Sequence, residues 1–321
     1  MKAIHLVETG SVDNFKVVDL PKPTPGDNEV LIKTKAVGVM FADIMQRRGG
    51  YIIQPELPFI PGKELSGVIE SVGRDVKKLE PGMRVMAFTL IGAYAEYVTI
   101  PEEHVIILPD HVSFQQGLVY LLNMPVAYLA VHEFGKIQPG DTILLHAASG
   151  GIGSLITQII NKEGNNTLIA LASSDEKLSY CKENGAEHCI NYRSTDYVQE
   201  VLKITEGKGV DVIFNSVAGN TFKTDPHAIK DRGKWLIYGS SAGVSTIDLF
   251  EFILKSLVII PFSVYTIQDS VIGEEMNQYR VNWLQNEKVL SPTKVFALED
   301  IGAAHTWIEN QKAIGKIVLE V

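Results

Sequence analysis

Three glycines within four positions follow one apolar run and precede another, an arrangement that favours anion binding. The stretch reads "DTILLHAASGGIGSLITQII", residues 141–160. In a strand, tight turn and helix start, the first N–H groups of the helix lack partners and the helix dipole favours negative charge. Gly150 and Gly151 let a pyrophosphate approach the backbone, while Gly153 lets the helix pack on the strand. The predicted ligands of a dinucleotide are Ser149, Gly150, Gly151, Ile152 and Gly153.

Residues about 20 positions further on decide between NAD and NADP, because an acidic side chain there binds the ribose hydroxyl of NAD. The predicted strand "TLIALA" is followed by Ser173 and Ser174, without a carboxylate that would repel a 2′-phosphate. Lys177 lies one turn into the next helix, and Tyr192 and Arg193 end the third strand, within reach of that phosphate. The sequence therefore predicts NADP(H).

Structural roles are the alternatives for these residues. Ser173 and Glu176 form an S-x-x-E pattern, which is typical of a capping box at a helix start. Lys177 also suits a solvated helix face, and the glycines also suit a turn with no ligand. We favour the cofactor because the glycine cluster begins an alternation of strands and helices.

The pattern of apolar and polar residues changes near residue 125. Before it, short apolar or alternating runs separated by turns such as "PKPTPGDN" predict a barrel-like, β-rich domain. After it, six strands alternate with helices and predict a doubly wound parallel sheet of the Rossmann type. The strands are "TILLHA", "TLIALA", "HCINY", "VDVIFNSV", "KWLIYG" and "LVIIPFS". Residues 264–321 have no sheet of their own, so we expect them to complete domain 1–124, and residues 125–263 to bind the nucleotide.

Ligands of such sheets bind beyond the carboxyl ends of the strands. The ends of the last three strands are therefore expected to line the cofactor site beside the glycine turn. The candidates are Ser216, Tyr238, Gly239, Ser240, Phe262 and Ser263.

The composition of the 321 residues excludes several classes of protein. A net charge of −9 argues against nucleic acid or an anionic membrane as partner, since both are bound by clustered Lys and Arg. The N-terminal residues lack signal-peptide features, and apolar runs such as "LVIIPF" are far shorter than the roughly 20 residues that span a bilayer. Cys181 and Cys189 match no metal spacing and are expected to be reduced thiols. We expect a cytoplasmic protein.

A β-rich unit, a six-strand nucleotide domain and a returning C-terminus resemble the medium-chain dehydrogenase/reductase superfamily, whose first domain is GroES-like. "HAASGGIG" is similar to the A-x-G-G-x-G form of its zinc-independent quinone oxidoreductases, which include zeta-crystallin. "FADIMQRRG" is especially close to the vesicle amine transport protein branch. The resemblance implies a homodimer, in which the apolar edge strand "LVIIPFS" pairs with its copy.

The resemblance also implies that no catalytic zinc is bound. Zinc alcohol dehydrogenases of this superfamily hold the metal with a Cys after the "VG" of the first domain and a His in a G-H-E motif. Met40 and Lys63 stand at these positions, and an ammonium has no lone pair to donate. Without that Lewis acid, the remaining chemistry is reduction of a quinone or an α,β-unsaturated carbonyl. Glu64 is expected to have a structural hydrogen-bonding role.

Quinone oxidoreductases line the acceptor pocket with an Asn and two tyrosines. Met40 and Met45 replace the Asn and the first Tyr here, while Tyr51 matches the second. Tyr51, with an ordinary pKa of about 10, is the candidate proton donor to the reduced oxygen; the cofactor ribose or a water are alternatives. Asn123 matches a family Asn, and Val126 stands near the nicotinamide where many relatives have Thr. The implied pocket is apolar and suits flat hydrophobic acceptors.

Two rivals to an NADPH-dependent quinone or enone reductase stay open. An enoyl-thioester reductase needs a basic groove for its carrier group, and the candidates Arg47, Arg48 and Lys63 suit a solvated surface equally well. A cofactor-binding redox sensor or structural protein with little turnover is the other rival, because a family fold does not guarantee its chemistry.

Overall fold

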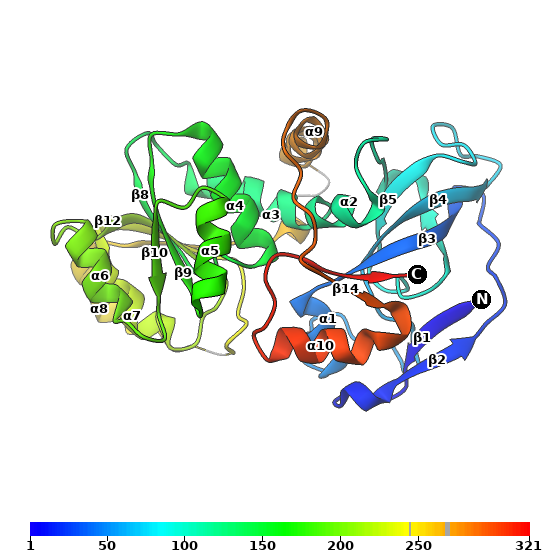
Figure 1. Cartoon of the computed structure of the whole chain (residues 1–321), viewed down its shortest axis with the longest axis horizontal. Helices are drawn as coiled ribbons and strands as arrows, with labels where there is room; N and C mark the ends of the chain where they lie inside the picture. Colours follow the sequence, from blue (N-terminus) through cyan, green and yellow to red (C-terminus); the bar gives the residue numbers. More distant parts are fainter. Residues whose placement is uncertain (244, 267–269) are drawn as a thin grey trace. The chain divides into compact units, whose positions relative to one another are not determined.

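The computed structural model describes residues 1–243, 245–266 and 270–321. The chain divides into two units, the first made of Met1–Leu122 and Arg280–Val321 and the second of Asn123–Tyr279 (Figure 1). No helix among the described residues is long and apolar enough to cross a bilayer.

A six-stranded parallel sheet forms the centre of the second unit, in the order β10-β9-β8-β11-β12-β13. Its strands are β8 (Thr142–Leu145), β9 (Thr167–Ala172), β10 (His188–Asn191), β11 (Val210–Asn215), β12 (Ile229–Ile237) and β13 (Val258–Pro261). This order confirms the predicted doubly wound sheet. The connections reverse direction between β8 and β11, so the carboxyl ends of these two strands border the crevice where such sheets bind ligands.

Helices surround this sheet and bury its apolar side chains. They are α3 (Asn123–Tyr128), α4 (Gly151–Glu163), α5 (Asp175–Glu183), α6 (Tyr197–Ile204), α7 (Thr221–Ala228) and α8 (Leu249–Lys255). Trp235 of β12 is fully buried, with its ring centroid 4.6 Å from that of Phe222 in α7 and 5.3 Å from that of Phe252 in α8. These aromatic contacts fix both helices on the sheet.

The first unit is β-rich, as predicted. It contains a two-stranded sheet, β1 (Lys2–Leu6) with β2 (Phe15–Asp19), and a seven-stranded sheet in the order β14-β15-β3-β4-β5-β7, in which β6 also pairs with β3. The seven strands are β3 (Glu29–Val39), β4 (Glu64–Val72), β5 (Arg84–Phe88), β6 (Tyr97–Pro101), β7 (Val105–Ile107), β14 (Lys294–Ala297) and β15 (Ile317–Glu320). Its main helices are α1 (Phe41–Arg47), α2 (Phe114–Tyr120) and α10 (Ile301–Glu309).

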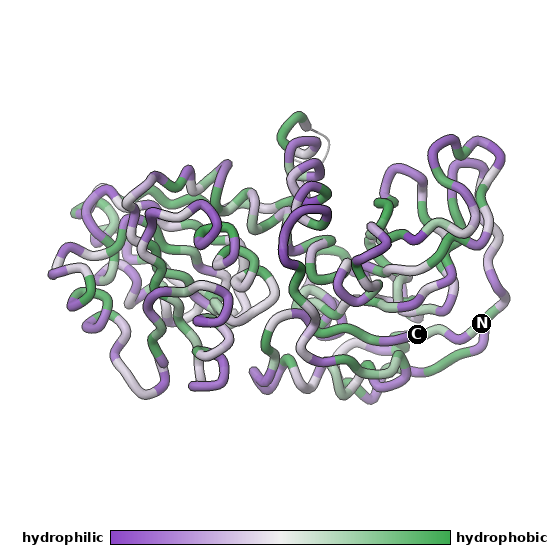
Figure 2. Tube along the Cα trace, turned by 45° about the horizontal axis from the view of Figure 1, so that its top comes forward, coloured by the Kyte–Doolittle hydropathy of each residue, from purple (hydrophilic) through white to green (hydrophobic). Residues whose placement is uncertain are grey.

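The C-terminal segment completes the sheet of the first unit. β15 pairs antiparallel with β3, opposite Ala36–Val39, and β14 extends the sheet beyond it. The boundary between the two units falls within α9 (Val271–Asn286). Hydrophobic residues concentrate along the strands of each unit, and hydrophilic residues on the outer loops (Figure 2).

Candidate functional site

The glycine turn joins β8 to α4 in the second unit. Gly150 is the N-cap of α4, and its N–H donates to the Ala147 carbonyl at 2.9 Å. Ala147 has a φ of 50°, so the chain reverses tightly there. A Cβ at Gly153 would overlap the Ala147 carbonyl oxygen, which explains why this position lacks a side chain. The start of α4 is partly exposed and can accept an anion at its N–H groups.

The carboxyl ends of β9 and β10 bring the predicted phosphate-binding residues together. The N–H of Tyr192 donates to the Ala172 carbonyl at 3.2 Å, so the loop after β10 lies beside the end of β9. Burial lowers the pKa of Lys177, and the positive charge of Arg193 lowers it further. Two cations near enough to repel each other at a strand end are suited to bind a phosphate.

The alternative role of Ser173 as a helix cap is wrong. Ser174 is the N-cap of α5, and its hydroxyl accepts from the Lys177 N–H at 3.4 Å. β9 ends at Ala172 and α5 begins at Asp175, so Ser173 stays in the connecting turn, where it is buried.

The ends of β11, β12 and β13 also meet, as the parallel sheet requires. The Tyr238 N–H donates to the Asn215 carbonyl at 3.1 Å, and the Phe262 N–H donates to the Ile237 carbonyl at 3.1 Å. A Cβ at Gly239 would lie 2.7 Å from the Ser216 carbonyl oxygen, so this glycine lets two strand ends approach. Ser240 and Ser263 follow these residues in the same loops. Burial raises the pKa of Tyr238, which therefore stays a phenol.

A buried polar network around Asp225 lies next to these strand ends, and no sequence motif predicted it. Asp225 of α7 is fully buried and accepts from Tyr197 Oη at 2.7 Å and from Asn215 Nδ2 at 2.7 Å. His146, which follows β8, contacts the same carboxylate at 2.8 Å through Nε2. Asn215 Oδ1 in turn accepts from the N–H groups of residues 217 and 218. One carboxylate thus fixes the loop that carries Ser216.

In the first unit, α1 carries the predicted acceptor-pocket residues. Met40 is the N-cap of α1, and its N–H donates to Asp43 Oδ2 at 2.9 Å. Met45 lies in α1 and Tyr51 in the loop after it, both half-buried. The Lys63 Nζ lies 4.9 Å from the centroid of the Tyr51 ring.

Asn123 and Val126 belong to the second unit instead, where both lie in α3. Asn123 is 6% exposed and begins the helix, while Val126 is half-buried. The structure therefore groups Met40, Met45 and Tyr51 within one unit and these two residues within the other.

Lys63 and Arg47 do not form a solvated basic surface, and this alternative was wrong. Lys63 is 1% exposed and donates to Asp43 Oδ1 at 3.2 Å and Gln46 Oε1 at 2.8 Å. Arg47 is 3% exposed and forms an ion pair with Glu309. Only Arg48 of the three candidates is exposed, and it also pairs with Glu309, at 2.6 Å. Cations are buried here because each has a carboxylate partner.

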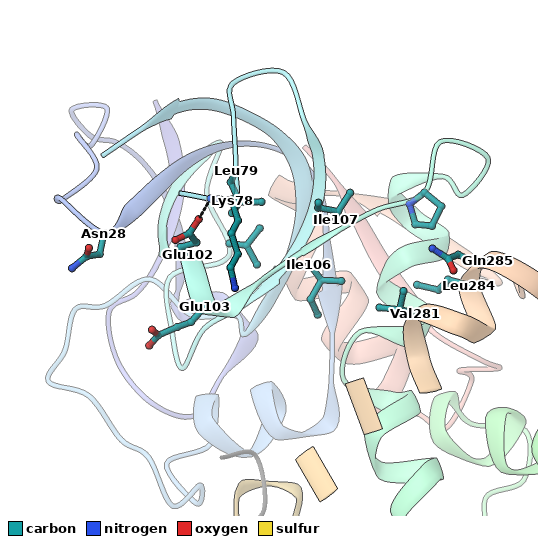
Figure 3. Close-up of a pocket in the computed structure, with 12 residues that line it drawn as sticks. Asn28, Lys78, Leu79, Glu102, Glu103, Ile106, Ile107, Val281, Leu284 and Gln285 are labelled. Atoms are coloured by element: carbon teal, nitrogen blue, oxygen red, sulfur yellow. Dashed lines mark hydrogen bonds between the residues drawn. The ribbon is translucent and has the colours of Figure 1, made fainter. Parts of the chain in front are cut away.

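A groove of about 890 Å³ lies elsewhere in the first unit, between the β7 region and α9 (Figure 3). Glu102 in this groove accepts from the Lys78 N–H, and Ile106, Val281 and Leu284 form its apolar part. None of the residues predicted to bind cofactor or acceptor lines it, so we assign it no part in the chemistry.

Comparisons with known proteins identify the family. An alcohol dehydrogenase GroES-like domain model matches residues 26–110, and a zinc-binding dehydrogenase model matches residues 151–279. The synaptic vesicle membrane protein VAT-1 homolog of Rattus norvegicus is 35% identical over 74% of this chain, and the match spans 59% of that protein's length. The quinone oxidoreductase of Sus scrofa is 32% identical over 99% of this chain and 97% of its own length.

The chain belongs to the quinone oxidoreductase and VAT-1-like branch of the medium-chain dehydrogenase/reductase superfamily. Its structure is similar to that of the Escherichia coli quinone oxidoreductase complexed with NADPH, with a TM-score of 0.92, 28% identity and full coverage of both chains. The resemblance stated from the sequence motifs is confirmed.

Zinc does not fit this chain at the position where the zinc alcohol dehydrogenases of the superfamily hold their metal, which Met40 and Lys63 occupy. The Lys63 ammonium is bound to Asp43 and Gln46, and the Met40 thioether is a poor ligand for this cation. Glu64 is buried and forms an ion pair with Lys316. In the described part of the chain, no three His, Cys, Asp or Glu side chains are grouped so as to hold a metal.

His305 of α10 is a buried titratable group beside this cluster. Its Nδ1 accepts from Arg47 Nε at 3.3 Å. Burial lowers the pKa of His305 to about 4, and the charges of Arg47 and Lys63 lower it while Asp43 opposes them. The folded protein therefore holds this imidazole neutral under conditions in which an exposed histidine gains a proton.

We predict an acid-dependent loss of stability that requires His305. Between the unfolded-state pKa of about 6.5 and the folded-state pKa of about 4, only the unfolded state binds a proton at His305. The contribution of His305 to the free energy of unfolding is therefore complete above about pH 6.5 and decreases until the pH has fallen through about 4. Chemical denaturation from pH 7 to 4.5 should show His305→Gln losing about 2 kcal/mol less than the natural protein. His227→Gln, at a side chain that is 59% exposed, is the control and should not change the profile. Equal losses for His305→Gln and the natural protein would contradict this account.

Proposed function

We propose that this protein is an NADPH-dependent, zinc-independent reductase that transfers hydride to quinones or α,β-unsaturated carbonyl compounds. The observation that carries the proposal is the combination of the β8–α4 glycine turn with the Lys177 and Arg193 cations at the neighbouring strand ends. The relative of known structure from Escherichia coli is a quinone oxidoreductase in complex with NADPH.

The cofactor site is proposed on the second unit. The N–H groups at the start of α4 would bind the pyrophosphate, and Ser173, Ser174, Lys177 and Tyr192 would surround the 2′-phosphate. A carboxylate at the end of β9 would repel that phosphate, and residues 172–174 are Ala, Ser and Ser. NADPH supplies the hydride when it is bound.

The acceptor is proposed to be flat and apolar. Met40 and Met45 offer adaptable thioether surfaces, and the Tyr51 ring offers a stacking face. With Lys63 in place of a metal ligand, no Lewis acid polarises the acceptor, so a conjugated acceptor that spreads the incoming charge is favoured.

A carrier-linked thioester is less well supported, because its phosphates need accessible cations. Arg47 and Lys63 direct their charges into the first unit, where Glu309 and Asp43 neutralise them. A sensor with little turnover is retained as an outcome of the experiment.

Purified protein should consume NADPH, and NADH far more slowly, when it is offered a panel of quinones, short enones and an enoyl-thioester. The double variant Lys177→Met/Arg193→Met should weaken NADPH binding about tenfold or more and leave NADH binding unchanged, since charge-assisted phosphate bonds contribute about 1.5–3 kcal/mol. Lys182→Met, on the same helix but exposed, is the matched control.

Tight NADPH binding without reduction of any acceptor would contradict the reductase proposal and favour the sensor. A preference for NADH, or an unchanged NADPH affinity in the double variant, would contradict the phosphate site.

A homodimer is proposed from the edge of the second unit's sheet. β13 is an edge strand, and unpaired edges associate unless they are covered. Next to it in sequence, α8 exposes four apolar side chains, Leu249, Phe250, Ile253 and Leu254, each at least 65% exposed. A contiguous apolar surface of this kind marks an interface, and a second copy that pairs through β13 would cover it.

The cytoplasmic location also stays a prediction.

Light scattering should give a mass of about twice 35.3 kDa for the natural protein. The double variant Phe250→Glu/Ile253→Glu should give a folded monomer, because two charges cannot be buried at the interface. Val17→Glu, a similar change at a side chain 50% exposed on β2, should remain a dimer. A dimeric Phe250→Glu/Ile253→Glu variant would rule out this interface.

A further inference from the structure

The Lys63 ammonium lies over the Tyr51 ring in the first unit, with Nζ 4.9 Å from the ring centroid. A cation within about 6 Å of a ring centroid is attracted by the negative face of the ring. Lys63 is 1% exposed, so solvent screens this attraction little. Lys63 Nζ carries three N–H donors. Two of them donate to Asp43 and Gln46, and the third remains for the side that faces the ring.

Gln46 links the ammonium to the loop that carries Tyr51. Its side-chain oxygen accepts from Lys63 Nζ at 2.8 Å, while its Nε2 donates to the Ile53 carbonyl at 2.9 Å. Gln54 Nε2 donates back to the Gln46 carbonyl at 3.2 Å. The loop is therefore held against α1 by the residue that also orients the cation.

The other charges around this ammonium are paired. Asp43 is the nearest anion, and its carboxylate is also bound by Tyr94 Oη at 3.1 Å and by the Met40 N–H at 2.9 Å. The remaining charged neighbours form separate ion pairs, Glu64 with Lys316 and Arg47 with Glu309, while His305 is neutral.

The two tyrosines that flank Asp43 and Lys63 experience opposite charges. Tyr94 is fully buried and donates to the Asp43 carboxylate, and burial together with that negative charge raises its pKa well above the ordinary value. Tyr94 is therefore a permanent donor to Asp43. Tyr51 is half-buried and faces the ammonium, and a negative charge spread over its ring would be attracted to that cation.

We propose that Lys63 is a positioning residue that stabilises the Tyr51 phenolate and so makes Tyr51 the proton donor to the acceptor oxygen. The inference rests on the proposed reductase function. Hydride, which carries two electrons, adds to the conjugated carbon of the acceptor, and the negative charge moves to its oxygen. The Tyr51 O–H bond then breaks as a new O–H bond forms on that oxygen. Water returns a proton to Tyr51, so each turnover consumes one NADPH, one acceptor and one proton.

The test is a pH titration of tyrosine ionisation, followed by ultraviolet absorbance without cofactor or acceptor. The difference between the natural protein and Tyr51→Phe should show one tyrosine that ionises about one pH unit below the ordinary value of about 10. Lys63→Met should remove this early ionisation, and Lys63→Arg should retain it. The control is Lys22→Met, since Lys22 Nζ lies 4.1 Å from the Tyr97 ring but is 41% exposed, and should leave the titration unchanged.

Kinetics give the second measurement. Tyr51→Phe should lower kcat about 100-fold with little change in the KM for NADPH, as expected for loss of a general acid. The alkaline limb of the kcat profile should move up by about one pH unit in Lys63→Met and stay in place in Lys63→Arg.

Ionisation of Tyr51 at or above the ordinary value would overturn the proposal, and the comparison with Tyr51→Phe decides this even if Lys63→Met fails to fold. Early ionisation of Tyr51 in a protein that reduces no acceptor would refute the reductase function and, with it, the proton transfer. Normal turnover together with ionisation of Tyr51 at the ordinary pH would refute only the role proposed for Lys63.

Discussion

A lysine ammonium is buried only when its charge and its hydrogen-bond donors are matched, and Lys63 achieves this through Asp43 and Gln46. The same two partners organise the surrounding backbone. Asp43 accepts from the N-cap of α1 and from Tyr94, and Gln46 binds the loop after α1. Removing one partner of a buried pair typically costs about 3–5 kcal/mol, because the other charge stays buried. This cluster therefore holds both the fold around α1 and the position of Tyr51.

The second unit uses a buried carboxylate in a comparable way. Asp225 joins side chains from the ends of β8 and β11 and from α6, so residues far apart in the chain are held at the edge where doubly wound sheets bind cofactors. The glycine turn supplies the N–H groups there. In both units a fully buried anion with several donors fixes loops that would otherwise be free to move, which is the preorganisation that binding sites need.

The sequence could predict features that depend on local pattern. The six parallel strands and the glycine turn follow from periodicity and turn residues, and the return of the C-terminal strand follows from its having no sheet of its own. Features that depend on distant partners could not be predicted. Asp225 lies 79 residues from His146, and the burial of Lys63 has no local signal because its partner Asp43 lies 20 residues earlier, on another element. Sequence alone does not identify the cap of α5, because Ser173 and Ser174 are equally good caps by type.

A lysine ion pair occupies the position of a metal ligand in this protein, so we expect the chemistry to proceed without a metal. The most direct measurement is the zinc content of the purified protein, together with its NADPH-dependent reduction of a quinone before and after treatment with a strong chelator. We expect far less than one zinc per chain and an unchanged rate after chelation. One zinc per chain whose removal abolishes the reduction, and whose return restores it, would contradict the account.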